Sequence, residues 1–315
     1  MPVRRGDREP VRPEVIRGVP GAVIGPAYDA CMSLTRPATL SPSKVSTFRD
    51  CALAFRYSAI DRLPEAPSVP ASRGTLVHAA LERLLDLPAA QRTVDRAVRC
   101  LAEATEAFRV DDDFVGLHLD QAAEATFLAE AEALVRRYFE LEDPTTVRPI
   151  GLELLLEARI GGLRLRGIID RLELDEDGGL VVTDYKTGRA PSVQVEQARL
   201  GGVHFYSYLC EQFFGVRPAR IQLLHLAEPV AIVSVPTEQS TRALARKVEA
   251  IWAAVDRACE DEDFRPRPGR GCSWCSYHAY CPAQGGDPTL APTRATVELP
   301  PEAPVSLRTP ALVAS

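Results

Sequence analysis

Three consecutive apolar stretches in the middle of the chain constrain its fold more than any other feature. They cover residues 151–160, 163–175 and 179–185, and short Gly-rich turns separate them. Apolar runs of this length, broken by glycine-containing turns, are typical of β-hairpins. We therefore expect three antiparallel strands in succession.

The residues around these strands show helical periodicity. Ser41 is placed to cap a helix that runs to about Ser58, and a second helix is expected at about 73–87. Further helices are expected near 91–109, 119–142, 194–214 and 238–260, and further strands near 219–227 and 229–235. This order, αβββαβ with a helical insertion at about 88–145, predicts an α/β (α+β) core.

The two ends of the chain differ in composition from the middle. Residues 1–38 contain six prolines and many arginines, and residues 284–315 are rich in Pro, Thr and Ala. Such segments are typical of disorder. We expect one ordered domain at 39–283, between a disordered N-terminal segment and a flexible C-terminal tail.

Two aspartates and a lysine lie on adjacent predicted strands. Asp170 follows Leu163–Ile169 and Asp184 follows Leu180–Thr183, so a hairpin can bring the carboxylates side by side. Lys186 lies two residues beyond Asp184 and therefore points to the same face. Two close carboxylates can hold Mg²⁺ or Mn²⁺, which activates water and polarises a phosphodiester, and a lysine can orient or deprotonate that water. An aspartate at a strand end is often only part of a turn, but the second carboxylate favours a catalytic site.

Lysine is rare in this chain. The 37 basic residues divide into 34 arginines and 3 lysines, namely Lys44, Lys186 and Lys247. An ammonium is a compact point charge and a guanidinium is a planar fork, so the two are not equivalent at a crowded site. The positions that keep lysine are therefore candidates for specific roles.

The two strand motifs, Gly167-Ile168-Ile169-Asp170-Arg171 and Asp184-Tyr185-Lys186-Thr187-Gly188, resemble those of the PD-(D/E)XK nuclease superfamily. More narrowly, they resemble the RecB-family exonucleases, which include the nuclease domain of bacterial AddB and the CRISPR-associated Cas4 proteins. The resemblance covers nearly all of the chain between the two end segments. It implies a restriction-endonuclease-like core in which Asp170 is the first metal aspartate, and Asp184 and Lys186 are the acidic and lysine positions of the D/E-x-K motif.

The resemblance also implies ligands outside these motifs. The family has a Gly-x-x-x-His pattern on an early helix, and Gly74–His78 matches it, so His78 becomes a metal ligand. A single histidine on an apolar helix is otherwise more often a core residue. The main-chain carbonyl of Tyr185 is a further expected ligand. Glu153 is the candidate for a supporting glutamate, with Glu157 as the alternative.

Substrate positioning departs from the family pattern. The family usually carries a glutamine four residues before a tyrosine in the helix after the lysine motif. Tyr206 fits the tyrosine, but residue 202 is glycine and Gln197 is out of register. We expect Tyr206, Gln197 and Arg171 to position substrate.

Three cysteines near the C-terminal end have Cys-x2-Cys-x5-Cys spacing with aromatic residues between them, at Cys272, Cys275 and Cys281. Clustered cysteines outside an oxidising compartment more often bind metal than form disulfides. His278 could complete a zinc site, and Cys51 is the alternative fourth ligand. In the iron–sulfur members of the family, one cysteine comes from an early helix, so the resemblance implies a [4Fe–4S] cluster on Cys51 and the three C-terminal cysteines. The cluster would staple the two ends of the domain together.

The remaining sequence features bound the function. No apolar run reaches 18 residues and no signal peptide is visible, so a cytoplasmic protein without a membrane span is expected. No Gly-x4-Gly-Lys-Ser/Thr phosphate loop occurs, so an ATP-driven motor is not expected in this chain. The sequence predicts a DNA exonuclease that acts on single strands or ends in repair or recombination, with a helicase or another repair protein as partner for duplex DNA. The alternative is a non-catalytic iron–sulfur DNA-binding or scaffold subunit of a helicase-nuclease or CRISPR adaptation complex.

Overall fold

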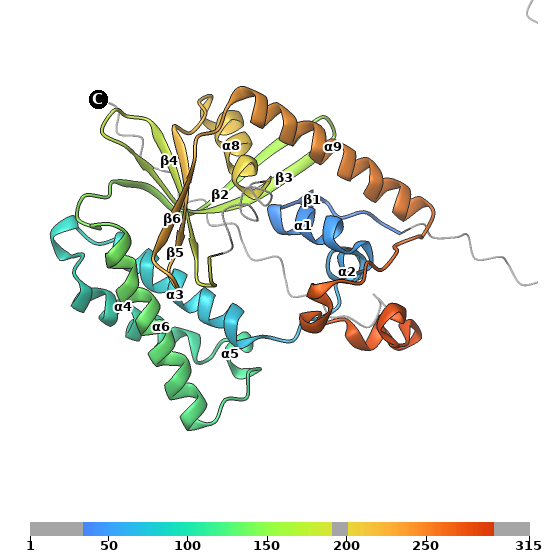
Figure 1. The fold of residues 1–315 in the computed structure, drawn as a ribbon, viewed down its shortest axis with the longest axis horizontal. Coiled ribbons are helices and arrows are strands. Elements are labelled where there is room, and N and C mark those ends of the chain that lie inside the picture. Colours follow the sequence, from blue (N-terminus) through green and yellow to red (C-terminus); the bar gives the residue numbers. More distant parts are fainter. Residues whose placement is uncertain (1–33, 191–200, 293–315) are drawn as a thin grey trace, which may run out of the picture. The chain divides into compact units, whose positions relative to one another are not determined.

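The computed structural model describes residues 34–190 and 201–292, which belong to one compact unit. Within these ranges the chain forms a six-stranded mixed sheet with helices on both faces (Figure 1). The strands are β1 (Thr39–Leu40), β2 (Pro149–Ile160), β3 (Leu163–Leu174), β4 (Leu180–Lys186), β5 (Arg220–His225) and β6 (Val230–Ser234). This confirms the predicted mixed α/β architecture. None of the described helices is long and apolar enough to span a membrane.

The strands that are joined by the Gly-rich turns are antiparallel, as predicted. β2 pairs with β3 and β3 with β4 in antiparallel register, which confirms the three expected strands. β5 then pairs in parallel with β4, and β6 closes the sheet in antiparallel register with β5. β1 pairs in parallel with the early part of β3, at Thr39↔Arg164 and Leu40↔Leu165.

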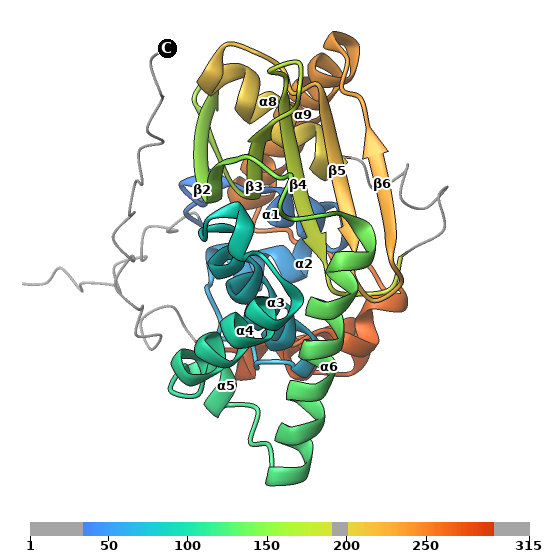
Figure 2. The ribbon, with the colours of Figure 1, turned by 90° about the vertical axis from the view of Figure 1, so that its left-hand side faces the viewer.

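One face of the sheet is covered by the helices nearest the two ends of the described chain (Figures 1 and 2). These are α1 (Pro42–Asp50), α2 (Ala52–Phe55), α8 (Gly201–Phe214) and α9 (Glu238–Glu260). Their apolar side chains form one core with residues of β3, β4 and β5. Gly167 allows a close approach, because a Cβ there would lie 2.8 Å from Leu209 Cδ1 of α8. The glycine of the first strand motif therefore lets α8 lie directly on β3.

The other face carries the predicted helical insertion and the helix before it (Figure 2). These elements are α3 (Val69–Leu85), α4 (Val94–Phe108), α5 (Asp112–Val115) and α6 (Gln121–Leu141). They form a second core that includes Tyr185 of β4 and Leu224 of β5. α3 begins earlier than its apolar pattern predicts, because the Ser68 side chain accepts a hydrogen bond from Ala71 N–H and Pro70 lies in the first turn.

The predicted first helix is broken in the structure. α1 ends at Asp50, Cys51 has an extended backbone (φ −160°, ψ 111°), and α2 then leads into a π-helical turn at Arg56–Ile60. The Cys51 sulfur accepts a hydrogen bond from the Arg267 backbone N–H at 3.5 Å. The break in the helix therefore places Cys51 beside a segment that is distant in the sequence.

Arg171 is fully buried between the sheet and α6. Its guanidinium forms ion pairs with Glu142 and, at 3.1 Å, with Glu173, and it donates a 2.9 Å hydrogen bond to the Tyr185 hydroxyl. All of these partners lie inside the helical side of the fold. The prediction that Arg171 positions substrate is therefore wrong, because this side chain has no access to a bound strand.

Because the ion pairs of Arg171 are buried, we expect their loss to lower the free energy of unfolding. Arg171→Met leaves Glu142 and Glu173 without their cation, so the free energy of unfolding should fall by about 3–5 kcal/mol. Arg164→Met, on an exposed position of the same strand, should change it by no more than about 0.5 kcal/mol. Denaturant unfolding of the two variants tests this, and equal effects would contradict the structural role of Arg171.

Candidate active site

The predicted catalytic aspartates lie where one edge of β3 is left open. β2 occupies the other edge along nearly the whole strand, while β1 pairs only as far as Leu165 and β4 only from Arg171 onward. Asp170 lies in this gap. One step beyond the Arg171↔Thr183 pair, the register places Asp184 opposite Asp170. The hairpin therefore brings the two carboxylates side by side, as its spacing predicts.

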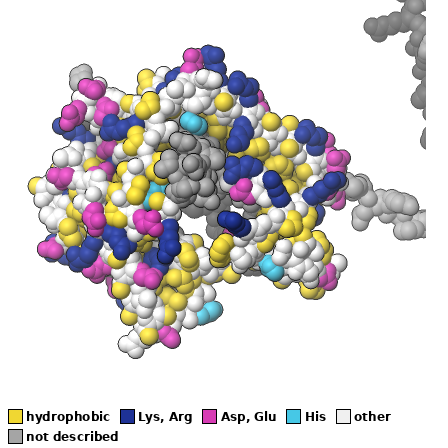
Figure 3. Space-filling view, in the orientation of Figure 1, with side chains coloured by type: hydrophobic (Ala, Val, Ile, Leu, Met, Phe, Trp, Pro, Cys, Tyr) yellow, Lys and Arg dark blue, Asp and Glu magenta, His cyan; other side chains and the backbone are white. Residues whose placement is uncertain are grey.

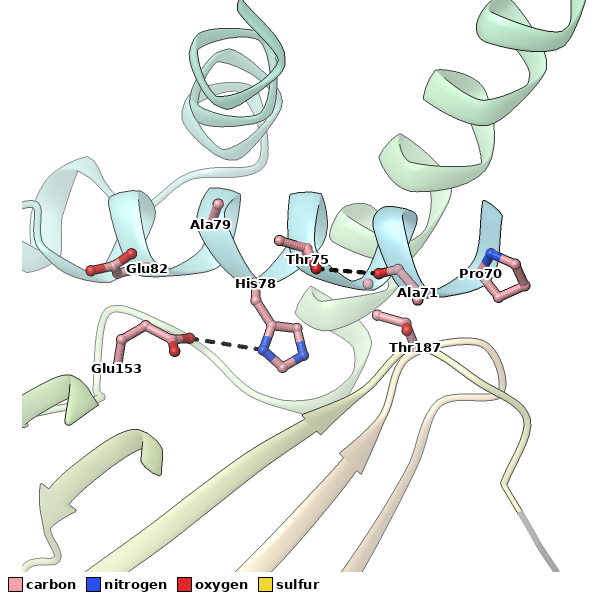
Figure 4. Close-up of a pocket in the computed structure, with 9 residues that line it drawn as sticks. Pro70, Ala71, Thr75, His78, Ala79, Glu82, Glu153 and Thr187 are labelled. Carbon is pink, nitrogen blue, oxygen red and sulfur yellow. Dashed lines mark hydrogen bonds and ion pairs between the residues drawn. The ribbon is translucent and has the colours of Figure 1, made fainter. Parts of the chain in front are cut away.

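Three ligand-type side chains converge beside this gap. His78 of α3, Glu153 of β2 and Asp170 offer ligand atoms that all lie within 4.8 Å of one another. His78 Nδ1 lies 3.5 Å from Asp170 Oδ2 and 3.8 Å from Glu153 Oε1, and Figure 4 shows the imidazole and the Glu153 carboxylate facing each other across a pocket. One imidazole and two carboxylates can hold a divalent ion such as Mn²⁺.

Glu153 reaches this position through an unusual backbone conformation. Its φ is +44°, which is rare for a residue with a side chain. By the β2–β3 register it lies opposite Asp170, and the two residues interrupt an otherwise regular ladder. Glu157 pairs with Arg166, four residues further from the gap, and is exposed. The structure thus brings Glu153, and not Glu157, to the candidate metal site, and backbone strain is common at functional sites.

Asp184, Lys186 and Tyr206 form the other half of the site. Lys186 Nζ forms an ion pair with the Asp184 carboxylate, and the lysine side chain is about half exposed. Tyr206 of α8 shares a hydrogen bond with Asp184. Burial raises the pKa of Tyr206, and the charges of Asp184 and Asp170 raise it further, so its hydroxyl stays protonated. It can therefore act as a hydrogen-bond donor beside the carboxylates.

The carboxylates give the site an excess of negative charge. Burial raises the pKa of Asp170 to about 7, with a further contribution from Asp184, although His78 and a 2.7 Å hydrogen bond from Tyr185 N–H oppose the shift. Burial lowers the pKa of His78, but Glu153 and Asp170 outweigh it, so the net shift is upward. Both shifts indicate a site that is most stable with an additional positive charge.

A pocket of about 530 Å³ opens from this group between α3 and the end of β4 (Figure 4). Gly74, His78 and Glu82 line it from α3, together with Glu153 and Thr187. A Cβ at Gly74 would lie 3.1 Å from Thr187 Oγ1. The glycine of the Gly-x-x-x-His pattern therefore allows α3 to approach the residue that follows Lys186. The main-chain carbonyl oxygen of Tyr185 lies 3.1 Å from His78 Nε2.

The sequence did not single out His225, which lies beside the site. It ends β5 and pairs in register with Lys186. Its side chain is 4% exposed, and neither ring nitrogen has a hydrogen-bond partner among the described residues. The sequence signal that could have indicated His225 is a histidine at the end of an apolar strand.

Gln197, the other predicted positioning residue, lies outside the described residues.

The four predicted cysteine ligands line a second hollow, of about 1000 Å³. Cys51 comes from the break after α1, and Cys272, Cys275 and Cys281 come from the C-terminal turns, drawn in red next to α2 in Figure 1. His278 lines the same hollow. Gly269 N–H donates to Cys272 Sγ at 3.3 Å, as Arg267 N–H does to Cys51. Burial raises the pKa of Cys275, and the three other cysteines raise it further.

The chain is similar in sequence pattern and in fold to known proteins. The sequence pattern of the PD-(D/E)XK nuclease superfamily matches residues 39–282. The crystal structure of a candidate exonuclease from Eubacterium rectale has the same fold, with a TM-score of 0.53, 13% identity, and coverage of 76% of this chain and 88% of that chain. The crystal structure of SSO0001 aligns with a TM-score of 0.38, 13% identity, and coverage of 80% and 89%. No curated protein matches the sequence.

The raised pKa of Asp170 predicts a pH-dependent gain in stability when its charge is removed. The metal-free folded state holds the Asp170 proton up to about pH 7, whereas the ordinary pKa of an aspartate is 3.8, so ionisation destabilises the fold as the pH rises between these values. In chelator at pH 8, the free energy of unfolding of Asp170→Asn should therefore exceed that of the parent by roughly 2–4 kcal/mol, which raises its unfolding temperature, and the gain should shrink toward pH 5. Thermal unfolding at both pH values tests this.

Manganese provides the control for this experiment. Added Mn²⁺ should stabilise the parent but not Asp170→Asn, because the ion binds only the folded state that retains its ligands. A gain that is the same at pH 8 and pH 5 would show that the effect does not come from the charge of Asp170.

Proposed function

Because the chain belongs to the PD-(D/E)XK nuclease superfamily, we propose that it is a metal-dependent deoxyribonuclease that hydrolyses phosphodiester bonds in DNA, acting as an exonuclease on single strands. The observation that carries this proposal is the set of side chains at the open edge of β3. His78, Glu153 and Asp170 converge there beside the Asp184–Lys186 pair.

His78, Glu153 and Asp170 are proposed to hold Mg²⁺ or Mn²⁺, with Asp184 and the Tyr185 carbonyl as further ligands. When bound, the ion supplies Lewis-acid polarisation of the phosphodiester and lowers the pKa of the attacking water. Lys186 is held next to the carboxylates by Asp184 and is half exposed, so its ammonium can orient water or offset charge on the phosphate. The protonated hydroxyl of Tyr206 can donate a hydrogen bond to a phosphate oxygen.

The substrate and partner are also proposals. We expect a single strand or DNA end to pass along the pocket between α3 and β4, below the helical insertion. The chain contains no phosphate-loop sequence, so degradation of duplex DNA should require a helicase or another repair protein that separates the strands.

We also propose that Cys51, Cys272, Cys275 and Cys281 hold a [4Fe–4S] cluster. Their common hollow and the two backbone N–H donors to sulfur support this, since hydrogen bonds to sulfur are a usual feature of iron–sulfur sites. The cluster would link the start of the domain to its C-terminal end and thereby stabilise the fold.

Zinc with His278 as fourth ligand is the alternative for this hollow. His278 lines the same hollow as the four cysteines. Three thiolates and one imidazole could therefore hold a tetrahedral zinc ion there.

Nuclease activity is tested with end-labelled single-stranded DNA and Mn²⁺ or Mg²⁺, using protein purified without oxygen. The parent should shorten the strand, and Lys186→Ala should lower the rate by about 100-fold or more, because it removes a group that acts in the transition state. Lys247→Ala makes the same change at an exposed position of α9 and should cut at the parental rate. The label position gives the polarity of cutting.

Two results would contradict the assignment. Equal activity of the parent and Lys186→Ala would point to a contaminating nuclease. A parent that binds DNA and carries iron but does not cut with either metal would favour the non-catalytic scaffold function.

The cluster is tested by iron content and absorbance near 400 nm. Cys51→Ala should lose both and unfold at a lower temperature, because one of four ligands is missing. Cys259→Ala, at a buried cysteine away from the hollow, should keep its iron, and so should His278→Ala. Full iron and absorbance in Cys51→Ala would refute this ligand set, and zinc lost only in His278→Ala would establish the alternative.

A further inference from the structure

Lys44 is a partly buried cation in the first turn of α1. Its Nζ donates a 3.3 Å hydrogen bond to the carbonyl oxygen of Thr39 in β1. Thr39 pairs in register with Arg164 of β3. The lysine therefore lies where α1 starts beside the strand that carries Asp170.

Two further cations approach Lys44. Burial lowers the pKa of Lys44, and the guanidiniums of Arg62 and Arg166 lower it further, while no acidic side chain of the described residues opposes them. Neither arginine forms an ion pair with any described residue, and both are exposed. Three positive charges so arranged repel one another, and such a group is stabilised by an anion.

The acidic residues nearest in sequence and register do not neutralise this group. Asp61, next to Arg62, pairs instead with Arg56 at 3.0 Å. Glu157 lies opposite Arg166 in the β2–β3 register but forms no ion pair with it among the described residues. Within residues 34–190 and 201–292, no ion pair therefore neutralises Arg62 or Arg166.

Arg62 is held in an unfavourable backbone conformation. Its φ is +55°, in the left-handed region, although Arg62 is not a glycine. The next residue, Leu63, is buried, and its N–H donates to Tyr57 O at 2.8 Å. Such strain costs of order 1 kcal/mol or more and is concentrated at binding sites.

The cluster lies along the strand that leads to the candidate active site. Arg166 precedes Asp170 by four residues of β3, which corresponds to about 13 Å of extended chain at roughly 3.3 Å per residue. Figure 3 shows Lys and Arg side chains gathered on the surface in the region where Figure 1 places α1 and α9. A strand whose scissile bond lies at Asp170 can therefore extend over the cluster.

We propose that Lys44, Arg62 and Arg166 form a binding site for a backbone phosphate of the nucleic acid strand, distinct from the phosphate that is cleaved. The proposal rests on the proposed nuclease function and specifies how that site holds its substrate. Arginine forks and a lysine point charge together match the oxygens of one phosphodiester. Such a contact fixes the register of the strand and carries no sequence preference.

The test is the salt dependence of binding in chelator, where the metal-dependent reaction is stopped. A labelled oligothymidylate is titrated with the parent, Lys44→Met and Arg166→Gln, and the logarithm of the binding constant is plotted against the logarithm of salt concentration. Each variant should bind about tenfold more weakly at low salt, as expected for a lost charged hydrogen bond, and the slope should fall by about 0.7 for each lost single-strand phosphate contact.

Lys247→Met is the matched control, since it removes a lysine from the exposed face of α9. Its affinity and slope should equal those of the parent. Lys44→Met should also unfold at or above the parental temperature, because methionine replaces a partly buried charge that two arginines repel. A lower unfolding temperature with an unchanged slope would assign Lys44 a structural role and overturn the proposal.

A second comparison identifies the kind of phosphate. The same oligomer is tested with and without a 5′-phosphate. Equal losses in Lys44→Met for both oligomers support an internal phosphodiester, and a loss only for the phosphorylated oligomer would overturn that assignment in favour of a terminal phosphate. If the parent cuts DNA but Lys44→Met keeps the parental slope, the proposed phosphate site is refuted and the proposed nuclease function is not. If the parent neither binds nor cuts, both proposals fail.

Discussion

The register between β3 and β4 holds two aspartates opposite each other, and much of the site is arranged around that repulsion. Asp170 is almost fully buried next to Asp184, so its pKa rises to about 7. Lys186, His78 and the Tyr185 N–H each offset part of the negative charge. Glu153 adds a third carboxylate at the cost of a strained backbone. Such an arrangement is unfavourable without a cation and is suited to a divalent ion.

Asp170 and Arg171 are adjacent in β3 but have different roles, one in the candidate metal site and one in the structure of the fold. Asp170 faces the open edge of the strand, whereas Arg171 extends into the helical side and forms ion pairs with Glu142 and Glu173. Tyr185 connects the two environments, because its N–H donates to Asp170 and its hydroxyl accepts from Arg171. The helical insertion is thereby fixed to the strands that carry the aspartates. A buried structural cation thus supports the backbone on which the metal site depends.

The parts of the fold and site that the sequence predicted are those that depend on residues close together in the sequence. Hairpin turns and apolar periodicity give the strands and helices, and strand spacing places Asp170, Asp184 and Lys186 together. The differences come from contacts between distant segments. The helix is broken at Cys51, whose sulfur contacts Arg267, and Arg171 is buried against Tyr138 and Glu142 at the end of the helical insertion. The left-handed backbone that brings Glu153 into the site has no sequence signal, because glutamate is not a residue that favours it.

The central claim is that the open edge of β3 is a divalent metal site. Crystals of the protein soaked with Mn²⁺ test it directly through anomalous scattering from the ion. The account predicts a manganese peak bound by Asp170, Glu153 and His78, with carboxylate oxygens at about 2.1 Å, and no such peak in Asp170→Asn. A well-ordered site without manganese at saturating concentration, or manganese only at other acidic positions, would contradict it.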